Sequence, residues 1–469
     1  MTIKIYDYVI IGSGAGGGPL AYYLTKAGKT VLMLEAGKAW AAEDYPDNEL
    51  HGNSELAWNG GMDPTADAAT VLIRGKVLGG GTVLNQALLD RFDDEAFNSW
   101  AALSGISTFS SSQMARHYEA VESQLALHTI TEDERNGNAH IYVQGFEELG
   151  YGWAPLRRGQ SQCNVEEGND CISCLTGCRR ASKQSMVNNF LPKAQQQGLT
   201  IVTECHVQGV VHGSHHVTIH ALHEGESKPF YAKQCVLSAG AIGSTEILLK
   251  SGYQHQLPAL GKGFYCHPQQ MTFALYDEPV DAHKGSFQAV KSEEPRFREQ
   301  GFKLENVFAG PVGVGFLLPQ IGVEHQDIMA AYRHLACIEV AVRDVTPGHI
   351  KLNRKGRLVI QKKMGRPERA RAKAGLEVIK EVYAATGAKR VLESPINISV
   401  HLMGGCAQGV DYRNSVVNPD FSVHGLPRLH VVDGSLYPNA PGINPSLTIM
   451  ALAHQAAERL LQEELGGAQ

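Results

Sequence analysis

Residues 6–37, YDYVIIGSGAGGGPLAYYLTKAGKTVLMLEAG, constrain the fold of this 469-residue chain more than any other stretch. The apolar run Val9–Ile11 precedes a cluster of glycines, a helical stretch extends from about Pro19 to Lys26, and a second apolar run ends in LEAG. Apolar runs of strand length on either side of a glycine-rich turn and a helix predict a strand–turn–helix–strand unit. The chain is therefore expected to contain an α/β domain.

The glycines of this turn are spaced as G-x-G-x-x-G, at Gly12, Gly14 and Gly17. Glycine lets the turn tighten and lets a pyrophosphate approach the helix N-terminus, where oriented N–H groups stabilise its charge. Glu35, at the end of the second strand, can accept hydrogen bonds from a ribose diol. Such a glycine turn also arises by chance, but together with the strand, the helix and Glu35 it predicts a dinucleotide-binding site.

Composition and charge bound the class of protein. A formal net charge of −6 gives no electrostatic reason to expect nucleic acid or an anionic membrane as a partner. The N-terminus lacks the basic and apolar regions of a secretory signal, and no window has the roughly 18 uncharged apolar residues of a transmembrane helix. We expect a cytoplasmic protein, or a periplasmic one only if it is exported with a partner that carries the signal.

Two further regions are legible as patterns. HHVTIHALH, residues 215–223, alternates polar and apolar residues, which favours a half-solvated strand over a histidine metal site. Residues 271–390 combine β-runs with a helical stretch, PERARAKAGLEVIKEVYAATG, and are interpreted as most of a second, substrate-facing domain. A closing helix, SLTIMALAHQAAERLLQEEL, begins just after PNAPGINP.

Several ordered segments resemble the glucose–methanol–choline (GMC) flavoprotein oxidoreductases. They include the opening unit with LEAG, RGKVLGGGTVLNQAL at 74–88, LSAGAIGSTEILLKSG at 237–252, LGKGFYCHPQ, HLMGGC at 401–406 and the block at 416–453. The resemblance implies FAD rather than NAD as cofactor. The further FAD-contacting positions that it implies are Gly79, Gly80, Thr82, Asn85, Val207, Ala239, Gly240, Asp433 and Gly434. Gly81 departs from the family pattern, which often has Ser there.

The resemblance also implies the fold and the domains. We expect a Rossmann-like FAD-binding domain made of residues 1–100, 185–270 and 391–469. Residues 101–184 and 271–390 would form a substrate domain on a mostly antiparallel β-sheet. The chain is shorter than many members of the family, which bears on the size and lid of the substrate pocket.

The implied chemistry is oxidation of an alcohol or sugar hydroxyl to a carbonyl, with a hydride passing to the flavin N5. The family pattern gives the role of base to His401 and puts Asn444 at the substrate oxygen. A histidine suits the first role because its usual pKa, about 6.5, lies near working pH. The alternatives are a backbone-bonded histidine in a tight turn, an N-cap for the closing helix at Asn444, and a plain turn residue at Asp433. His267 is interpreted as structural or adjacent to FAD.

Four cysteines, Cys163, Cys171, Cys174 and Cys178, lie within sixteen positions. The spacing of the last three is typical of local iron–sulfur ligation, and a Cys-rich loop of some GMC sugar dehydrogenases holds a three-iron cluster. A similar loop of the long-chain alcohol oxidases has no cluster known to us. An iron–sulfur site, preferably three-iron rather than four-iron, and packed thiols both stay open, with zinc or a disulfide less expected.

Four classes of function follow. The first is an FAD-dependent dehydrogenase, which can pass electrons through the cysteine loop to a small subunit or a cytochrome. The second is an oxidase of alcohols or sterols that reduces oxygen directly. The others are a light-driven fatty acid decarboxylase, as the family also contains, and a non-catalytic flavin electron-transfer or assembly subunit. His401 together with Asn444 argues for the enzymes that oxidise an alcohol.

Overall fold

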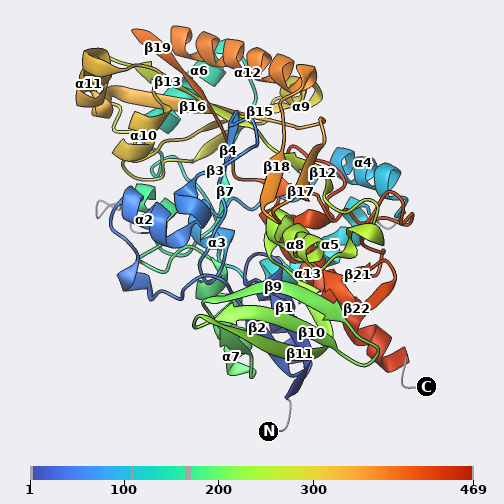
Figure 1. Cartoon of the computed structure of the whole chain (residues 1–469). Helices are drawn as coiled ribbons and strands as arrows, with labels where there is room; N and C mark the ends of the chain where they lie inside the picture. The colour runs from blue at the N-terminus through green and yellow to red at the C-terminus, as the bar shows by residue number, and fades with distance from the viewer. Residues whose placement is uncertain (1–3, 108, 164–170, 467–469) are drawn as a thin grey trace.

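A computed structural model describes residues 4–107, 109–163 and 171–466 of the chain. It contains two large sheets joined by a smaller one, with helices packed against them (Figure 1). Both chain ends lie near the first large sheet, at the bottom of the view in Figure 1, and the second large sheet lies at the top. No helix of the described ranges is long and apolar enough to cross a lipid bilayer.

The first sheet is built on the predicted N-terminal unit, which the structure confirms. The path of the sheet is β21-β22-β11-β1-β2-β8. Its strands are β1 (Ile5–Ile11), β2 (Val31–Leu34), β8 (Thr200–Val202), β11 (Glu226–Leu237), β21 (Ser422–Val423) and β22 (Leu426–Val431). β1 pairs in parallel with β2 and β11, and its residues from Tyr8 to Ile10 are fully buried. A continuous apolar run suits such a strand because both faces of a parallel sheet are covered.

Helices and a hairpin complete this part of the molecule. Contacts join α1 (Gly17–Lys26) to α7 (Phe190–Gln196) and α13 (Ser446–Gly466), and join α13 to α5 (Ser111–Glu122). The hairpin β9 (Cys205–His212) and β10 (Val217–His223) extends β11 in antiparallel fashion. Along β10 the alternate residues Val217, Ile219 and Ala221 are buried, while His220 is exposed. The alternation predicted from HHVTIHALH is thus confirmed.

The second large sheet is mostly antiparallel, as expected for the substrate domain. Its strand order is β3-β4-β19-β13-β16-β15-β14-β6. The bounds are β3 (Asp63–Pro64), β4 (Thr70–Leu72), β6 (Trp153–Pro155), β13 (Gln269–Leu275), β14 (Val290–Ser292), β15 (Phe302–Asn306), β16 (Leu335–Val342) and β19 (Arg390–Ser399). The predicted helix is confirmed as α12 (Arg366–Ala385), which packs with α6 (Gly137–Leu149) against β16. β3, β4 and β19 join this sheet although their residues lie in segments expected in the FAD-binding domain.

A four-stranded sheet, β18-β17-β12-β20, connects the two parts. It contains β12 (Lys262–Cys266), the hairpin β17 (Gly348–Leu352) and β18 (Leu358–Gln361), and β20 (Leu402–Met403). The hairpin was expected in the substrate domain, but it pairs with β12 and not with the second large sheet. β12 and β20 run antiparallel, with Cys266 opposite Leu402. This register places the next residues, His267 and His401, beside each other.

Candidate active site

The first glycine turn lies at the carboxyl ends of the parallel strands, where open α/β sheets bind their ligands. Gly12 has φ +101°, and a Cβ there would lie 2.3 Å from the carbonyl oxygen of Ser238. A Cβ on Gly17 would lie 2.0 Å from the carbonyl oxygen of Gly12, so this glycine permits close packing of α1. Gly14 has no neighbour within 4 Å of such a position. Two glycines therefore shape the turn, and the third leaves the open side that a pyrophosphate requires.

Glu35 is held rigidly at the end of β2. Its Oε2 accepts hydrogen bonds from the backbone N–H of Ser13 (3.0 Å) and from the Ser13 hydroxyl (2.6 Å), and its Oε1 accepts one from the N–H of Gly37 (2.8 Å). Burial raises the pKa of Glu35, and these hydrogen bonds oppose the rise. The Ser13 hydroxyl also accepts the N–H of Gly79 at 2.8 Å, so one side chain joins the first glycine turn to the second.

The second glycine-rich loop packs directly on the first. Gly79 and Gly80 have φ of +96° and +56°, and a Cβ on Gly80 would lie 3.1 Å from the Cα of Gly14. Thr82, in the short helix α3 (Gly81–Leu84), donates to the carbonyl of Gly79 at 2.6 Å. Asn85 donates to the hydroxyl of Ser446, the first residue of α13, at 3.4 Å. The two loops and the start of the closing helix thus form one rim.

Asp433 ties the end of β22 to the start of α8 (Gly240–Lys250). Its Oδ2 accepts from the N–H of Gly240 (2.9 Å) and the hydroxyl of Ser244 (2.5 Å), and its Oδ1 accepts from the N–H of Ser435 (2.8 Å). Burial raises the pKa of this carboxyl, while the hydrogen bonds oppose the rise. Gly434 accepts through its carbonyl from the N–H of Gly404, which brings this turn against the loop that carries His401.

Of the remaining implied FAD positions, Val207 is a buried residue of β9 and Ala239 donates its N–H to Ser244 at 3.1 Å. Open backbone at Gly14, a fixed carboxylate at Glu35 and the helix N-terminus of α1 form the donor and acceptor set that FAD requires. The residues present therefore fit the cofactor.

His267 is buried and His401 is half-buried, and their rings are in contact. Their Nδ1 atoms lie 3.1 Å apart, and the backbone N–H of Gly442 donates to Nε2 of His267 at 3.0 Å. Burial, then the charges of His401 and Lys303, lower the pKa of His267 well below its ordinary value. Burial, then the charge of Lys303, lowers the pKa of His401 to about 3. Both rings are consequently neutral at working pH.

These contacts define the tautomer of each ring. Because Nε2 of neutral His267 accepts from Gly442, the ring carries its proton on Nδ1 and donates it to Nδ1 of His401. Neutral His401 then carries its own proton on Nε2, the nitrogen that has no hydrogen-bond partner among the described residues. The sequence did not predict the contact between His267 and His401, although His267 lies in one of the segments that resemble the family.

Asn444 lies just before α13 but is anchored elsewhere. Its Oδ1 accepts from the ammonium of Lys303 at 2.5 Å, so the oxygen that an N-cap would use is already engaged. Lys303 also pairs with Oε1 of Glu305 at 2.8 Å. Glu305 lies opposite Glu339 across β15 and β16, and burial, then Glu305, raises the pKa of Glu339 well above its ordinary value. No role was predicted for Lys303. The only sequence signal is that Lys303 and Glu305 are charged residues at alternate positions of a short, otherwise mostly apolar strand.

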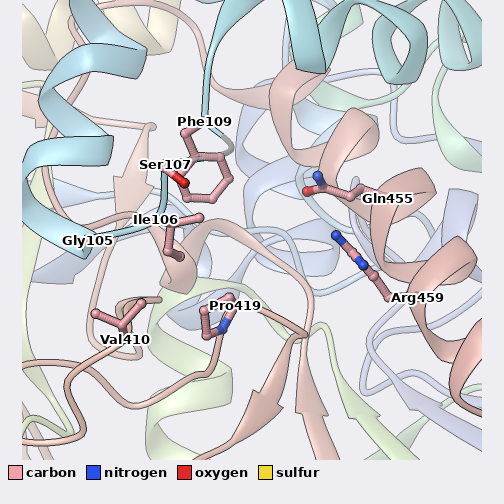
Figure 2. Close-up of a pocket in the computed structure, with 8 residues that line it drawn as sticks. All are labelled: Gly105, Ile106, Ser107, Phe109, Val410, Pro419, Gln455 and Arg459. Atoms are coloured by element: carbon pink, nitrogen blue, oxygen red, sulfur yellow. The ribbon is translucent and has the colours of Figure 1, made fainter.

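A cavity of about 330 Å³ adjoins this cluster and includes Lys303, Gly442 and Ile443 in its wall. The wall is strongly charged. Its charged residues are Asp90, Arg91, Asp93, Lys291, Glu293, Glu294, Arg298, Lys303 and Arg343. A second hollow, of about 220 Å³, lies between Ile106 and Arg459, and no predicted site residue lines it (Figure 2).

The cysteine segment is described only in part, because Cys171 has its side chain outside the described residues. Cys163 accepts from the hydroxyl of Ser182 at 3.4 Å and packs in the hydrophobic core beside the second large sheet. Cys178 accepts from the N–H of Lys183 at 3.5 Å, and a hydrogen bond with Cys174, then burial, raises its pKa. Among the described side chains these three sulfurs do not gather into one ligand group, and the cysteines with described side chains form no disulfide.

Two histidines of the C-terminal block, His424 and His430, have local hydrogen-bond partners. His430 is buried, with Nε2 3.1 Å from Oε1 of Gln234. His424 has Nε2 2.8 Å from the hydroxyl of Ser415. These contacts are structural and involve none of the predicted site residues.

Comparison with known proteins agrees with this geometry. The family models for the N-terminal and C-terminal parts of GMC oxidoreductases match residues 53–269 and 348–453. A long-chain-alcohol oxidase of Arabidopsis thaliana is 26% identical over 97% of this chain and 67% of its own length. A cholesterol oxidase of Mycobacterium tuberculosis is 26% identical over 96% of this chain and 90% of its own.

Among solved structures, a pyridoxine 4-oxidase from Mesorbium loti has the same fold. Its TM-score is 0.78 at 17% identity, over 97% of this chain and 99% of that one. The fold, the glycine loops and the two family matches lead to one conclusion. The chain belongs to the GMC oxidoreductase family and is an FAD-dependent oxidoreductase.

Proposed function

We propose that the chain oxidises the hydroxyl group of a small-molecule alcohol to a carbonyl, with the alcohol bound at His401 and Asn444. The observation that carries the proposal is the linked cluster at this position. His401 contacts His267, His267 is held by Gly442, and Asn444, two residues further on, is held by Lys303. The similar long-chain-alcohol oxidase and cholesterol oxidase support a CH–OH substrate.

FAD, when bound, would accept the hydrogen of the alcohol carbon together with its two electrons. The chain must hold the hydroxyl oxygen and take its proton. In the resting arrangement Nε2 of His401 and Nδ2 of Asn444 are both donors, so they can bind the oxygen between them. This arrangement orients the alcohol before the proton leaves.

His401 can accept the hydroxyl proton of the alcohol on Nε2 when the ring is in its other tautomer. In that form Nδ1 of His401 donates to His267, whose own proton moves to Nε2 and displaces the hydrogen bond from Gly442. Losing one buried hydrogen bond costs about 1–3 kcal/mol, which is small beside the barrier of an enzymatic reaction. We therefore keep His401 as the base and Asn444 as the group that holds the oxygen.

The route of the electrons is a separate proposal. We infer that packed thiols rather than an iron–sulfur cluster fill the cysteine segment, because the described sulfurs of Cys163, Cys174 and Cys178 do not gather into one ligand group. Iron and flavin stoichiometry of anaerobically purified protein tests this directly. Iron bound in proportion to flavin would restore the three-iron hypothesis and a protein electron acceptor.

Turnover assays separate the candidate activities. An oxidase consumes oxygen and forms peroxide with the alcohol alone, whereas a dehydrogenase turns over under nitrogen only with an added acceptor. Oxidation of an alcohol in the dark would exclude the photodecarboxylase. If no alcohol of a panel of aliphatic, sterol and sugar substrates reduces the flavin, the proposed function is wrong and a non-catalytic flavin subunit is favoured.

A further inference from the structure

Lys303 is a half-buried charged residue that contacts Asn444 and lowers the pKa of His401, the two proposed substrate-binding groups. It lies on β15, between the charged cavity and Asn444. Resting on the proposed function, we propose that Lys303 is a positioning residue. It fixes the amide of Asn444 with its NH₂ group toward the substrate oxygen, and its positive charge adds to burial in keeping His401 neutral.

The first half of the proposal follows from hydrogen-bond chemistry. An ammonium group can only donate, so the atom of Asn444 that lies 2.5 Å from Nζ must be the carbonyl oxygen. The amide nitrogen then points away from Lys303. Asn444 is 6% exposed, and no described residue accepts a hydrogen bond from its Nδ2. This donor is therefore available to an oxygen of a ligand.

The charge of Lys303 is secured by its surroundings. Burial by itself would lower the pKa of this lysine, but Glu305 and then Asp90 raise it above its ordinary value. Glu305 makes the direct ion pair with Lys303, with Nζ and Oε1 2.8 Å apart. Asp90 makes its own direct ion pair with Lys291, with Oδ1 and Nζ also 2.8 Å apart. Glu339 contributes from the neighbouring strand. The ammonium therefore persists over the working pH range.

The second half concerns the electrostatics of the histidine pair. The groups that face it are Lys303 from β15 and, acting on His267, the guanidinium groups of Arg298 and Arg343. A nearby cation destabilises an imidazolium, so it lowers the pKa of His401 and leaves the ring neutral. A base must be neutral to accept a proton, and it is neutral above its pKa. Lys303 thus moves the acidic limb of the pH–rate profile to low pH.

Three variants separate orientation from charge. Lys303→Met removes both the donor and the charge, whereas Lys303→Gln removes the charge and keeps an N–H donor for Asn444. Lys291→Met is the matched control, because this lysine lines the same cavity and pairs with Asp90 but contacts neither Asn444 nor the histidines. Bound flavin and thermal unfolding are measured for every variant.

We expect Lys303→Met to lower kcat about 10- to 100-fold at unchanged flavin content. Without Lys303 the amide of Asn444 is no longer oriented, so its N–H donor is lost to the transition state. Lys303→Gln should retain more of kcat at high pH. In both variants the acidic limb of kcat/KM should move to higher pH, while Lys291→Met should move neither quantity. At high pH, Lys303→Met combined with Asn444→Ala should have a kcat no lower than that of Asn444→Ala alone, because there the lysine acts only through the amide.

A second measurement does not depend on turnover. An NMR titration of histidine-labelled protein, assigned with His401→Asn, should show a higher pKa of His401 in both Lys303 variants. An unchanged pKa and an unchanged kcat would overturn the proposal even if the wild-type protein oxidises alcohols. If the wild-type flavin is not reduced by any alcohol, the proposed function fails, but the titration still decides what Lys303 does.

Should Lys303→Met fail to fold because it strands the Glu305 carboxylate, the pair Lys303→Met and Glu305→Gln removes both charges together. Replacing both partners of a buried ion pair is much less damaging than removing one. The same loss of kcat and the same rise of the His401 pKa are expected. Wild-type values in the double variant would contradict the positioning role.

Discussion

Replacing Lys183 with methionine tests how the cysteine segment serves the cofactor site. Lys183 is 2% exposed, and its ammonium donates to the carbonyls of Val83 (2.5 Å), Asn85 (2.9 Å) and Cys174 (2.7 Å). Two of these carbonyls belong to the second glycine-rich loop and its end, and the third belongs to the turn Cys171–Thr176. One buried cation therefore clamps the cysteine segment onto the proposed FAD loop.

The expected magnitude follows from what methionine leaves behind. It keeps the apolar stem, but three carbonyls lose a charged donor, and each hydrogen bond to a charged group contributes about 1.5–3 kcal/mol. Removing one member of a buried charged network typically costs about 3–5 kcal/mol in total. Because the FAD loop then populates its binding form less, we also expect the Kd for FAD to rise about 10-fold or more.

The assay is thermal and denaturant unfolding of apoprotein and holoprotein, with FAD titrated by quenching of its fluorescence. Lys355→Met is the control, since Lys355 is an exposed residue of the turn between β17 and β18. The variant at Lys183 should be less stable in both forms and should bind FAD more weakly, and the control should match wild type. Unchanged stability together with unchanged FAD affinity would refute the clamp.

Three further perturbations follow from buried charges. Glu35→Gln should weaken FAD binding roughly 10- to 100-fold in the same titration, because the ribose loses a charged acceptor; unaltered affinity would argue against a ribose contact. Lys362→Met should lower the free energy of unfolding by about 3–5 kcal/mol, since it strands Asp344, 2.9 Å away and fully buried; a loss below about 1 kcal/mol would contradict this. Burial would raise the pKa of Glu368, but hydrogen bonds, among them the Val345 N–H, lower it from 4.5 to about 2. The stabilisation by Glu368 is therefore complete above pH 4.5 and is lost as pH falls toward 2. In Glu368→Gln the free energy of unfolding should consequently change less with pH across that window than in the wild type.

Local patterns predicted several elements of the fold. The unit from β1 to β2, the polar alternation of β10, the helix α12 and the closing helix α13 all form where the sequence indicates. Each depends on periodicity or on glycine spacing within a few residues, which a single sequence displays. The two glycine loops also lie side by side, with Gly80 beside Gly14.

Long-range pairing decided what the sequence did not show. Lys303 reaches Asn444, 141 residues away, only because β15 pairs with β16 in the second sheet. His267 meets His401 because β12 and β20 pair in one register. The hairpin at β17 and β18 could pair with either sheet on its pattern alone, and β19 lies in the second large sheet despite following the expected domain boundary. Register and partner choice arise from tertiary packing, which periodicity does not encode.

Anaerobic reduction of the bound flavin by an alcohol, followed by its absorbance in a stopped-flow instrument, tests the central claim most directly. The wild-type flavin should bleach with at least one alcohol of the panel. His401→Ala should bind the same amount of flavin but reduce it about 10²- to 10⁴-fold more slowly. His424→Ala, which replaces a half-buried histidine bonded to Ser415, should behave as wild type. Bleaching at the wild-type rate in His401→Ala would contradict the account.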